Sequence, residues 1–257
     1  MIFKLLFKIA IPRPKLEAYN SYLFIGPHPD DIEIGAGATA AKLARAGKKV
    51  TFLIATDGRY GTHDDSVDLN DLVKTRQLEA INGAAVLGVK DVIFLPFEDG
   101  GLYDKRDMTV AIAKVIAKVK PDVVIAPDPK LPNEMHLDHL NTGEAASCAI
   151  IMSDTYRFMK EYDLPRAETK AIAFYYTARP NRYVNVTKTL KTGYNSVLEH
   201  KSQFPDDEEG NRNKKLLWLY FNIQTIRYGL RCFARRAQGF KIYDIKHIHC
   251  GPEAELV

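Results

Sequence analysis

Residues 21–31 read SYLFIGPHPDD, a short apolar and aromatic run that ends in a polar turn carrying His28, Asp30 and Asp31. Three later runs of similar character lie at 50–56, 92–95 and 123–126. Apolar runs of this length suit strands that are covered on both faces, as in a parallel sheet. We therefore expect a central sheet whose strands end in polar turns.

Longer segments with helical periodicity separate these runs. They end at a glycine or stop before a proline, as helices commonly do, and lie at 36–46, 71–87 and 108–119. Further along we expect two strands at 171–176 and 183–186, two helices at 187–200 and 214–234, and an exposed loop at 206–213. The alternation predicts an α/β fold: a Rossmann-like, mostly parallel sheet with helices on both faces and a C-terminal extension.

The composition bounds the size and the compartment of the protein. The 257 residues are 46% hydrophobic, which predicts a single domain over 1–257, with a core at about 21–190 and a helical extension at about 191–257. The net charge is only +4 and the basic residues are dispersed, so we expect no nucleic-acid partner. Three widely spaced cysteines form neither a disulfide framework nor a cysteine zinc site, which favours a cytoplasmic location.

The beginning of the chain is apolar. Lys4 and Lys8 interrupt residues 1–11, which predicts an amphipathic appendage. No other stretch approaches the roughly 20 apolar residues that a membrane span requires. We therefore expect no membrane span.

Acids and histidines follow nearly every predicted strand. Since ligands bind at the carboxyl ends of strands in open parallel sheets, these side chains are expected to meet at one edge. They are His28, Asp30 and Asp31 after the first strand, Asp57 after the second, Glu98 and Asp99 after the third, and Asp128, His136, Asp138 and His139 after the fourth.

Imidazoles and carboxylates without cysteine are typical of a catalytic zinc site. Adjacent Asp30 and Asp31 leave the backbone in different directions, so one can ligate the metal while the other acts as general base. His136 and His139 lie three apart and would share a helix face, but the spacing leaves open which of them is the ligand. Either motif alone also fits an ordinary turn or a surface helix, so only the pair is specific.

The two motifs together resemble the LmbE-like, or PIG-L-type, zinc N-deacetylases. The first is His28-Pro29-Asp30-Asp31 and the second is His136-Leu137-Asp138-His139. The resemblance covers about 21–249 and extends to the diacetylchitobiose deacetylase branch through four further motifs: residues 56–58 (TDG), 126–129 (APDP), 175–177 (YYT) and 202–207 (SQFPDD). Leu137 replaces a usual proline, and Ile32 stands where many members have glutamate; neither position carries the expected chemistry.

The resemblance implies a role for each motif residue. It gives His28, Asp31 and His139 to the metal, Asp30 to the general base and His136 to transition-state stabilisation. Asp99, or else Asp138, is implied to orient His136. Zinc is the implied cofactor, although two imidazoles and a carboxylate hold several divalent ions.

The resemblance also implies substrate contacts. Arg76 matches an arginine that binds sugar hydroxyls, whereas a solvated pair with Glu79 is the ordinary alternative. Asp57 and His249 are assigned to substrate binding, the latter in its own or a neighbouring subunit of a homo-oligomer. The histidines His63 and His200 are expected to be surface or structural residues.

The expected activity is therefore removal of acetate from an N-acetylated amino sugar of the N-acetylglucosamine or diacetylchitobiose type, by hydrolysis of a linear amide bond. One rival is a dinucleotide-dependent oxidoreductase, because Gly35, Gly37 and Ala40 mimic a fingerprint that has Asp57 20 residues past Gly37. Acids where a pyrophosphate would rest oppose it. The other rival is a non-catalytic sugar-binding or zinc-binding protein, which would have no need of a base such as Asp30.

Overall fold

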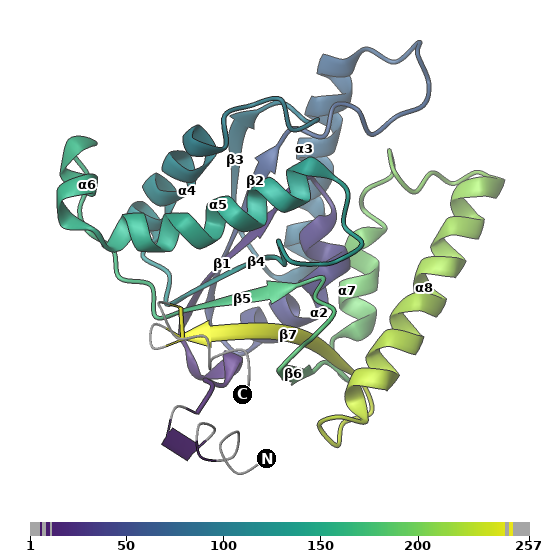
Figure 1. Cartoon of the computed structure of the whole chain (residues 1–257). Coiled ribbons are helices and arrows are strands. Elements are labelled where there is room, and N and C mark those ends of the chain that lie inside the picture. Colours follow the sequence, from purple (N-terminus) through teal and green to yellow (C-terminus); the bar gives the residue numbers. More distant parts are fainter. Residues whose placement is uncertain (1–5, 7–8, 11, 245–246, 249–257) are drawn as a thin grey trace.

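The computed structural model describes residues 6, 9–10, 12–244 and 247–248 (Figure 1). His249 and most of the expected amphipathic appendage at 1–11 lie outside these residues. Within them, no helix is long and apolar enough to cross a membrane.

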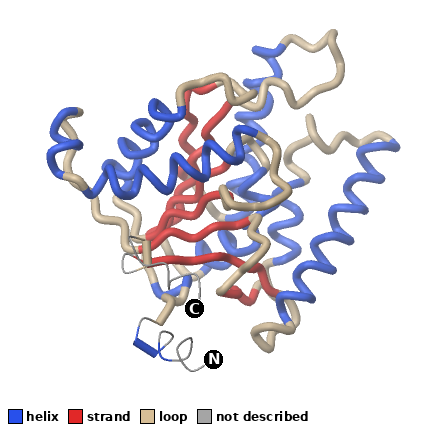
Figure 2. The backbone as a smooth tube through the Cα atoms, viewed as in Figure 1, coloured by secondary structure: helices blue, strands red, loops and turns tan. Residues whose placement is uncertain are grey.

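A seven-stranded sheet forms the centre of the molecule (Figure 2). Its order is β3-β2-β1-β4-β5-β7-β6; β1 to β5 are parallel, and β7 runs antiparallel to both of its neighbours. The bounds are β1 Ser21–Gly26, β2 Lys49–Thr56, β3 Asp91–Phe97, β4 Val123–Pro127, β5 Ala171–Tyr175, β6 Arg182–Asn185 and β7 Ala237–Asp244. The expected Rossmann-like, mostly parallel sheet is confirmed.

Helices cover both faces of the sheet, as expected (Figure 1). After the short η1 Leu16–Ala18, they are α2 Asp31–Arg45, α3 Leu69–Leu87, α4 Lys105–Val119, α5 Leu137–Asp154, α6 Tyr156–Glu161, α7 Leu190–Val197 and α8 Glu208–Gly229. Because strand side chains alternate, two cores form: α2 and α3 pack on one face, and α4, α5 and α6 pack on the other.

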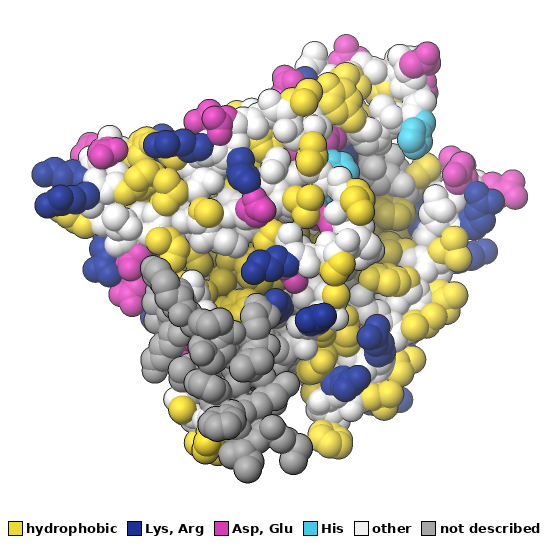
Figure 3. Space-filling model, viewed as in Figure 1, with side chains coloured by type: hydrophobic (Ala, Val, Ile, Leu, Met, Phe, Trp, Pro, Cys, Tyr) yellow, Lys and Arg dark blue, Asp and Glu magenta, His cyan; other side chains and the backbone are white. Residues whose placement is uncertain are grey.

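The helix α8 lies at one side of the molecule and packs on α7 through Phe221, Leu190 and Val197. Large apolar side chains remain exposed along it (Figure 3). They include Leu216, Leu219, Tyr220, Ile223 and Ile226.

Six predicted strands agree with the structure, but the strand β7 was not expected. It lies in the segment 191–257, so the prediction of a helical extension is wrong for these residues, which join the main sheet. Phe240 and Ile242 point into the core while Lys241 between them is half-exposed. This alternation is the strand signal, and Gly239 and the basic residues 235–236 obscure it.

Two helix beginnings also differ from expectation. The helix α2 begins at Asp31, five residues before the expected 36, so it starts inside the polar turn. The predicted loop at 206–213 is wrong, since Asp207 caps α8 by accepting a hydrogen bond of 2.7 Å from the Gly210 amide. An aspartate ahead of a polar segment is a helix start signal that resembles a loop in composition.

The order of the strands reverses between the paired strands β1 and β4: β2 and β3 lie beyond β1, and β5 lies beyond β4 on the other side. In open α/β sheets, ligands bind at such a switch point beyond the carboxyl ends of the strands. The turn after β1 carries His28, and the segment after β4 carries His136 and His139. The topology therefore brings both histidine motifs to one place.

Candidate metal centre

His28 lies at the centre of the candidate site and is only 8% exposed. Its Nδ1 lies 3.3 Å from Asp31 Oδ2, and its Nε2 lies 3.1 Å from Asp138 Oδ2 and 3.2 Å from Asp99 Oδ1. The His28 amide also donates a hydrogen bond to Asp31 Oδ2. The short β1–α2 turn therefore holds the imidazole among three carboxylates that come from three segments of the chain.

Asp30 and Asp31 diverge at the start of α2, as expected for adjacent residues. Asp30 is the N-cap residue but makes no capping hydrogen bond, and its backbone has a positive φ of 114°. Its carboxylate Oδ2 instead faces Arg76 Nη2 at 3.3 Å, whereas Asp31 turns toward His28 and His139. A left-handed backbone is costly for aspartate, so the turn is held in this conformation by its surroundings.

The second histidine motif lies at the start of α5. His136 is the N-cap residue, and its Nδ1 accepts a hydrogen bond of 3.3 Å from the Asp138 amide. His139 lies in the first turn, with Nε2 3.3 Å from Asp31 Oδ2. The two rings therefore have different surroundings. His139 faces Asp31, while nearly half of the His136 side chain remains exposed.

His28, Asp31 and His139 form a group that fits a divalent metal. Their donor atoms all lie within 4.8 Å of one another, and Asp31 Oδ2 faces one ring nitrogen of each histidine. Two imidazoles and one carboxylate are a donor set of catalytic zinc, with a position left for water. A second group within reach of a cation, His28, Asp99, His136 and Asp138, shares His28.

Carboxylates lie beside the outer nitrogens of both histidines in the triad, through a hydrogen bond to His28 and within ion-pair distance of His139. Asp138 is fully buried and also accepts hydrogen bonds from Tyr103 Oη and the Gly100 amide. Glu134 Oε2 lies 3.0 Å from His139 Nδ1, and the other oxygen of Glu134 accepts from the Met135 and His136 amides. Metal-binding histidines are typically oriented in this way.

Asp99 and Asp138 lie at the site but contact His28 more closely than His136. Asp138 Oδ2 is 3.8 Å from His136 Nδ1 and 3.1 Å from His28 Nε2, and Asp99 contacts His28 at 3.2 Å. Both acids therefore lie behind His28, one of the metal donors. Their spacing in the sequence does not indicate this position. Glu134 and Tyr103 were not singled out from the sequence, since neither belongs to one of the recognised motifs.

The charges at the site shift its pKa values in opposite directions. Burial opposes protonation of His28, but Asp138, Asp31 and Asp99 outweigh it and raise the pKa of the imidazole. Burial also disfavours the Asp31 carboxylate, but His139 and His28 outweigh it and lower its pKa. For Asp30, burial and the neighbouring Asp31 raise the pKa to about 6, against the attraction of Arg76. The adjacent carboxylates thus have different proton affinities.

Arg76 and Glu79 are both buried, which excludes the alternative of a solvated pair on the helix surface. Arg76 donates hydrogen bonds to the carbonyls of Gly58 (2.6 Å) and Pro29 (2.7 Å), while Glu79 accepts from the Ser202 amide and hydroxyl. Arg76 therefore stiffens the turns that carry the site and still faces Asp30.

Asp57 lies behind the site. Its carboxylate pairs with Arg59 at 2.8 Å and accepts from the Asp99 amide at 3.2 Å, so it fixes the segment that carries Asp99. It does not line the cavity described next. The predicted role of Asp57 in substrate binding is therefore supported only indirectly, by its contact with Asp99, which does line the cavity.

A cavity of about 380 Å³ opens over the metal triad. His136, Asp30, Arg76 and Asp99 line it together with the three donors of the triad. Tyr60 and Gln203 also line it and were not singled out as site residues. Tyr60 belongs to no motif, and Gln203 lies in the 202–207 motif, to which the sequence assigned no role. The lining is polar and charged, which suits a small hydroxylated ligand.

The remaining histidines divide as follows. His63 is exposed. His200 is fully buried and its Nε2 lies 3.4 Å from Glu33 Oε1, so it is structural rather than a surface residue. The pair lies against Gly83, where an added Cβ would meet Glu33 Oε1 at 2.9 Å.

The glycines of the dinucleotide rival serve packing. Gly35 and Gly37 lie inside α2 and not in the turn after β1. An added Cβ at Gly35 would meet Tyr175 Cδ2 at 2.3 Å, so this glycine allows the helix to approach β5. The geometry of a pyrophosphate-binding loop is therefore missing from this part of the chain.

Comparison with known proteins places the site in a wider context. A model of the PIG-L family, described as GlcNAc-PI de-N-acetylase, matches residues 23–150. The diacetylchitobiose deacetylase of Thermococcus kodakarensis is 33% identical over 261 residues, which cover 100% of this chain and 94% of the relative.

Solved structures show the same likeness. The N,N'-diacetylchitobiose deacetylase of Pyrococcus horikoshii, solved with an inhibitor, has a TM-score of 0.87 at 32% identity, over 100% of this chain and 96% of the other. The 4-carboxy-2-hydroxymuconate hydratase of Pseudomonas putida has a TM-score of 0.68 at 18% identity, over 87% and 95% of the two chains. The second match shows the fold alone.

Proposed function

Because the chain belongs to the PIG-L family of deacetylases, we propose that it is a zinc-dependent hydrolase that releases acetate from an N-acetylated amino sugar. N-acetylglucosamine and diacetylchitobiose are the first substrates to test, since the relatives above include diacetylchitobiose deacetylases. The carrying observation is Asp30, a carboxylate outside the donor triad that lines the same cavity. A metal-binding protein without catalysis has no need of it.

The donor set fits zinc through His28, Asp31 and His139, although other divalent ions suit the same set. Zinc held there would supply Lewis-acid activation of a water molecule and of the acetamide carbonyl. Asp138 and Glu134 behind the two imidazoles would keep the inner nitrogens aimed at the ion.

Asp30 is proposed as the general base. It takes a proton from the water as the oxygen bonds to the acetyl carbon, and a raised pKa of about 6 suits a carboxylate that must accept a proton and release it again. As the carbon–nitrogen bond breaks, the proton passes to the leaving nitrogen, which departs as the free amine of the sugar. Acetic acid leaves with the new oxygen and ionises to acetate by losing the second proton of the water.

His136 is proposed to stabilise the charge that develops on the carbonyl oxygen. Its Nδ1 accepts from the Asp138 amide, so the neutral ring carries its proton on Nε2. The ring lines the cavity and lies with its centroid 4.7 Å from that of His28. A preorganised donor of this kind lowers the activation barrier by about 3 kcal/mol in other hydrolases.

Arg76 is proposed to contact the sugar, because it lines the cavity beside the base. Asp99 is proposed to orient His28, whose Nε2 it contacts at 3.2 Å. His249 stays a prediction, since it lies outside the described residues. A cytoplasmic location and a homo-oligomer likewise stay predictions, the first supported by the cysteine usage and the second by the resemblance alone.

The first test is acetate release by the zinc-loaded protein and its Asp30→Asn variant. We expect the variant to bind one equivalent of zinc and to lose about 10²–10⁴-fold in turnover, because the amide cannot accept the proton. A chelated wild-type sample provides the second control. Near-normal acetate release by the variant would show that Asp30 is not the base, and zinc binding without release from any acetamido sugar would favour a binding protein.

A further inference from the structure

The segment that follows α7 reaches the metal-centre cavity through Gln203, a residue without a role in the proposed reaction. Residues 200–203 read HKSQ, and Gln203 lines the cavity together with Arg76, Gly61 and Tyr60. The segment lies outside residues 23–150, the part of the chain that matches the family model. The likeness to that model therefore does not account for this wall of the site.

Hydrogen bonds hold this segment against α3. Glu79 is 7% exposed and accepts from the Ser202 amide at 2.7 Å and from the Ser202 hydroxyl at 2.6 Å. Arg76 lies one turn earlier on α3, so one helix positions both the guanidinium and the segment that carries Gln203. The carbonyl of the fully buried His200 accepts from the Gln203 amide at 3.0 Å. The backbone at Gln203 is thus ordered without a ligand, which lowers the entropic cost of binding.

The contacts of the Gln203 carboxamide decide which of its two polar atoms is available to a ligand. Its Nε2 donates to the Gly61 carbonyl at 2.9 Å and to Ser202 Oγ at 3.3 Å. A carbonyl only accepts, and the Ser202 hydroxyl already donates to Glu79, so the atom that faces them is the nitrogen. Within the described part of the chain, no group donates a hydrogen bond to Gln203 Oε1. The carboxamide therefore offers the cavity an acceptor.

Arg76 and Gln203 meet at Gly61 and complement each other chemically. An added Cβ at Gly61 would collide with Arg76 Nη1 and lie 3.2 Å from Gln203 Nε2. The guanidinium only donates hydrogen bonds and Gln203 Oε1 only accepts them, whereas a sugar hydroxyl does both. The two side chains therefore match the two roles of a hydroxyl group, and the neutral carboxamide adds no charge beside the proposed base.

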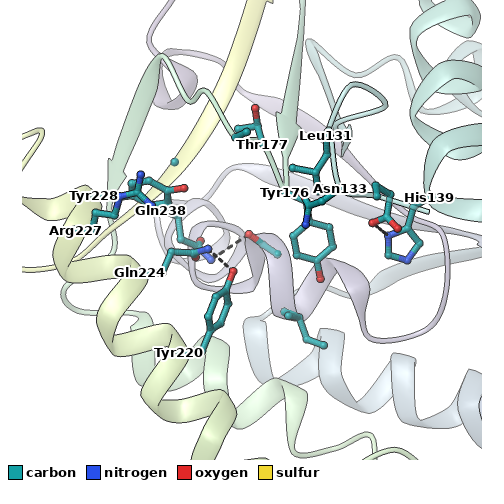
Figure 4. A pocket seen from close by; sticks show the side chains of 15 residues that line it. Leu131, Asn133, His139, Tyr176, Thr177, Tyr220, Gln224, Arg227, Tyr228 and Gln238 are labelled. Carbon is teal, nitrogen blue, oxygen red and sulfur yellow. Dashed lines mark hydrogen bonds and ion pairs between the residues drawn. The ribbon is translucent and has the colours of Figure 1, made fainter. Parts of the chain in front are cut away.

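A second cavity shows to which part of a ligand such a hydroxyl belongs. This cavity, of about 470 Å³, meets the metal centre at His139, which lines both cavities. Figure 4 shows it extending from His139 past Tyr176 to Gln224 of α8. Gln203 lines only the cavity over the metal triad. A group that contacts Gln203 therefore belongs to the sugar bound at the metal.

We propose that Gln203 is a substrate-binding residue whose Oε1 accepts a hydrogen bond from a ring hydroxyl of the sugar that reacts at the metal. The inference rests on the proposed function and deepens it, because the sugar ring becomes a requirement of the site in addition to the acetamido group. A site built to bond a hydroxyl rejects the analogue that lacks it, since the acceptor is then left unpaired. Acetamido sugars are therefore preferred over simple acetamides.

The test combines a change in the protein with a change in the sugar. Wild type and Gln203→Leu, which removes the acceptor at similar side-chain volume, are compared by kcat/KM on N-acetylglucosamine and on its monodeoxy analogues, each lacking one hydroxyl. We expect the variant to lose about tenfold on N-acetylglucosamine. On one analogue, wild type should lose about as much and the variant should lose nothing further, because the same hydrogen bond is already absent.

Two further variants separate binding from folding. Gln77→Leu is the matched control, because Gln77 lies beside Arg76 on α3 and does not line the cavity; it should behave as wild type on every sugar. Ser202→Ala keeps Gln203 but removes the hydroxyl between its carboxamide and Glu79. Its loss on N-acetylglucosamine should be smaller than that of Gln203→Leu and should shrink on the same deoxy sugar.

The outcomes distinguish this inference from the proposed function. An equal loss on all the sugars in Gln203→Leu would assign the residue a structural role at Gly61 and overturn the contact, as would no loss on any. Absence of acetate release from N-acetylglucosamine in wild type would count against the proposed function itself.

Calorimetry tests the contact without turnover. Binding of N-acetylglucosamine to zinc-loaded Asp30→Asn should weaken about tenfold when Gln203→Leu is added. Equal binding to the single and the double variant, or binding to neither, would overturn the contact.

Discussion

Glu134 shows how one carboxylate can tune a metal centre from outside the donor set. Its Oε2 faces His139 Nδ1 at 3.0 Å, while its Oε1 accepts from two backbone amides. Glu134→Gln keeps an oxygen for the amides but removes the charge beside the imidazole. We expect zinc affinity to fall about 10–100-fold, as it does when outer partners of metal ligands are changed.

Competition with a chromophoric chelator measures this change. Glu168→Gln is the control, since Glu168 is exposed and remote in the sequence from both histidine motifs. An affinity that is equal in Glu134→Gln and wild type would show that the carboxylate orients the loop and not the ligand.

At the residue scale, sequence spacing located what is adjacent in the chain. His28, Asp30 and Asp31 lie in one turn and His136 and His139 in another, so composition and strand ends together predicted the cluster. Glu134 and Tyr103 approach from segments without a recognised motif, and Tyr176 belongs to the 175–177 motif but was not assigned to the site. Only the tertiary arrangement reveals which buried polar groups such residues satisfy.

The contact between α2 and α7 sets a prediction for whole elements. An added Cβ at Gly193 of α7 would lie 2.7 Å from the Ala38 amide nitrogen and 2.9 Å from its Cα. We expect Gly193→Ala to lower the free energy of unfolding by about 1–3 kcal/mol. The added methyl group would push the packed helices apart, and the energy this costs exceeds what alanine gains in helix propensity.

Gly37→Ala on the facing helix is the matched control. Its Cβ would meet Ser196 Oγ at 3.5 Å, an ordinary contact, so it should leave stability unchanged or raise it slightly. Denaturant unfolding of both variants measures the difference. Similar stabilities would mean that α7 can shift and that the two helices are not locked at Gly193.

Asp122 ties together the beginnings of three strands. Its Oδ2 accepts from the Asn20 (2.9 Å) and Ser21 (3.1 Å) amides at the start of β1, and its Oδ1 lies 2.7 Å from Lys170 Nζ, just before β5. Burial disfavours the carboxylate, but Lys170 and the two amides outweigh it and lower the pKa of Asp122. We expect Asp122→Asn to cost about 1 kcal/mol at pH 7.

The sign of the pH dependence follows from the lowered pKa. A carboxyl of this kind contributes stability above its unfolded pKa of about 3.9, and the contribution is lost as the pH falls through the folded value. The difference between wild type and Asp122→Asn should therefore shrink in acid, while Asp65→Asn at an exposed site should show little difference at any pH. A gap that stays constant down to acid pH would assign the effect to hydrogen-bond geometry and not to charge.

Elements with strong internal periodicity were the ones predicted well. The buried strands β1, β2 and β4 are recognisable in the sequence as apolar runs. The helix α3 ends at a C-capping glycine, Gly88. The strand β7 and the start of α8 were missed because their signals are short: an alternation of two inward side chains, and a single capping aspartate. Tertiary pairing decides such segments.

At the scale of the whole molecule, the metal triad joins the two histidine segments that flank the switch point. His28 and Asp31 come from the β1–α2 turn, and His139 comes from α5 more than 100 residues later. Zinc at about 100 times its dissociation constant would stabilise the folded state by about 2.7 kcal/mol. For a chain of this size we expect the melting temperature to rise by about 5–10 °C.

Calorimetric scans with zinc and with a chelator check this expectation. His139→Ala should lose the increase, whereas His63→Ala, at an exposed position, should retain it. An unchanged melting temperature in wild type would mean that zinc binds the unfolded chain as well, or that the three donors do not form the site.

The position of β7 has a consequence for how the protein is made. This strand follows every other strand in the chain, yet it lies between β5 and β6 in the finished sheet. A ribosome therefore releases β6 long before its hydrogen-bonding neighbour exists, and both β5 and β6 must wait with open edges of the kind that invite aggregation. Sheet completion can only follow emergence of residues 237–244, so translation that stops short of them would yield a nascent chain in need of a chaperone.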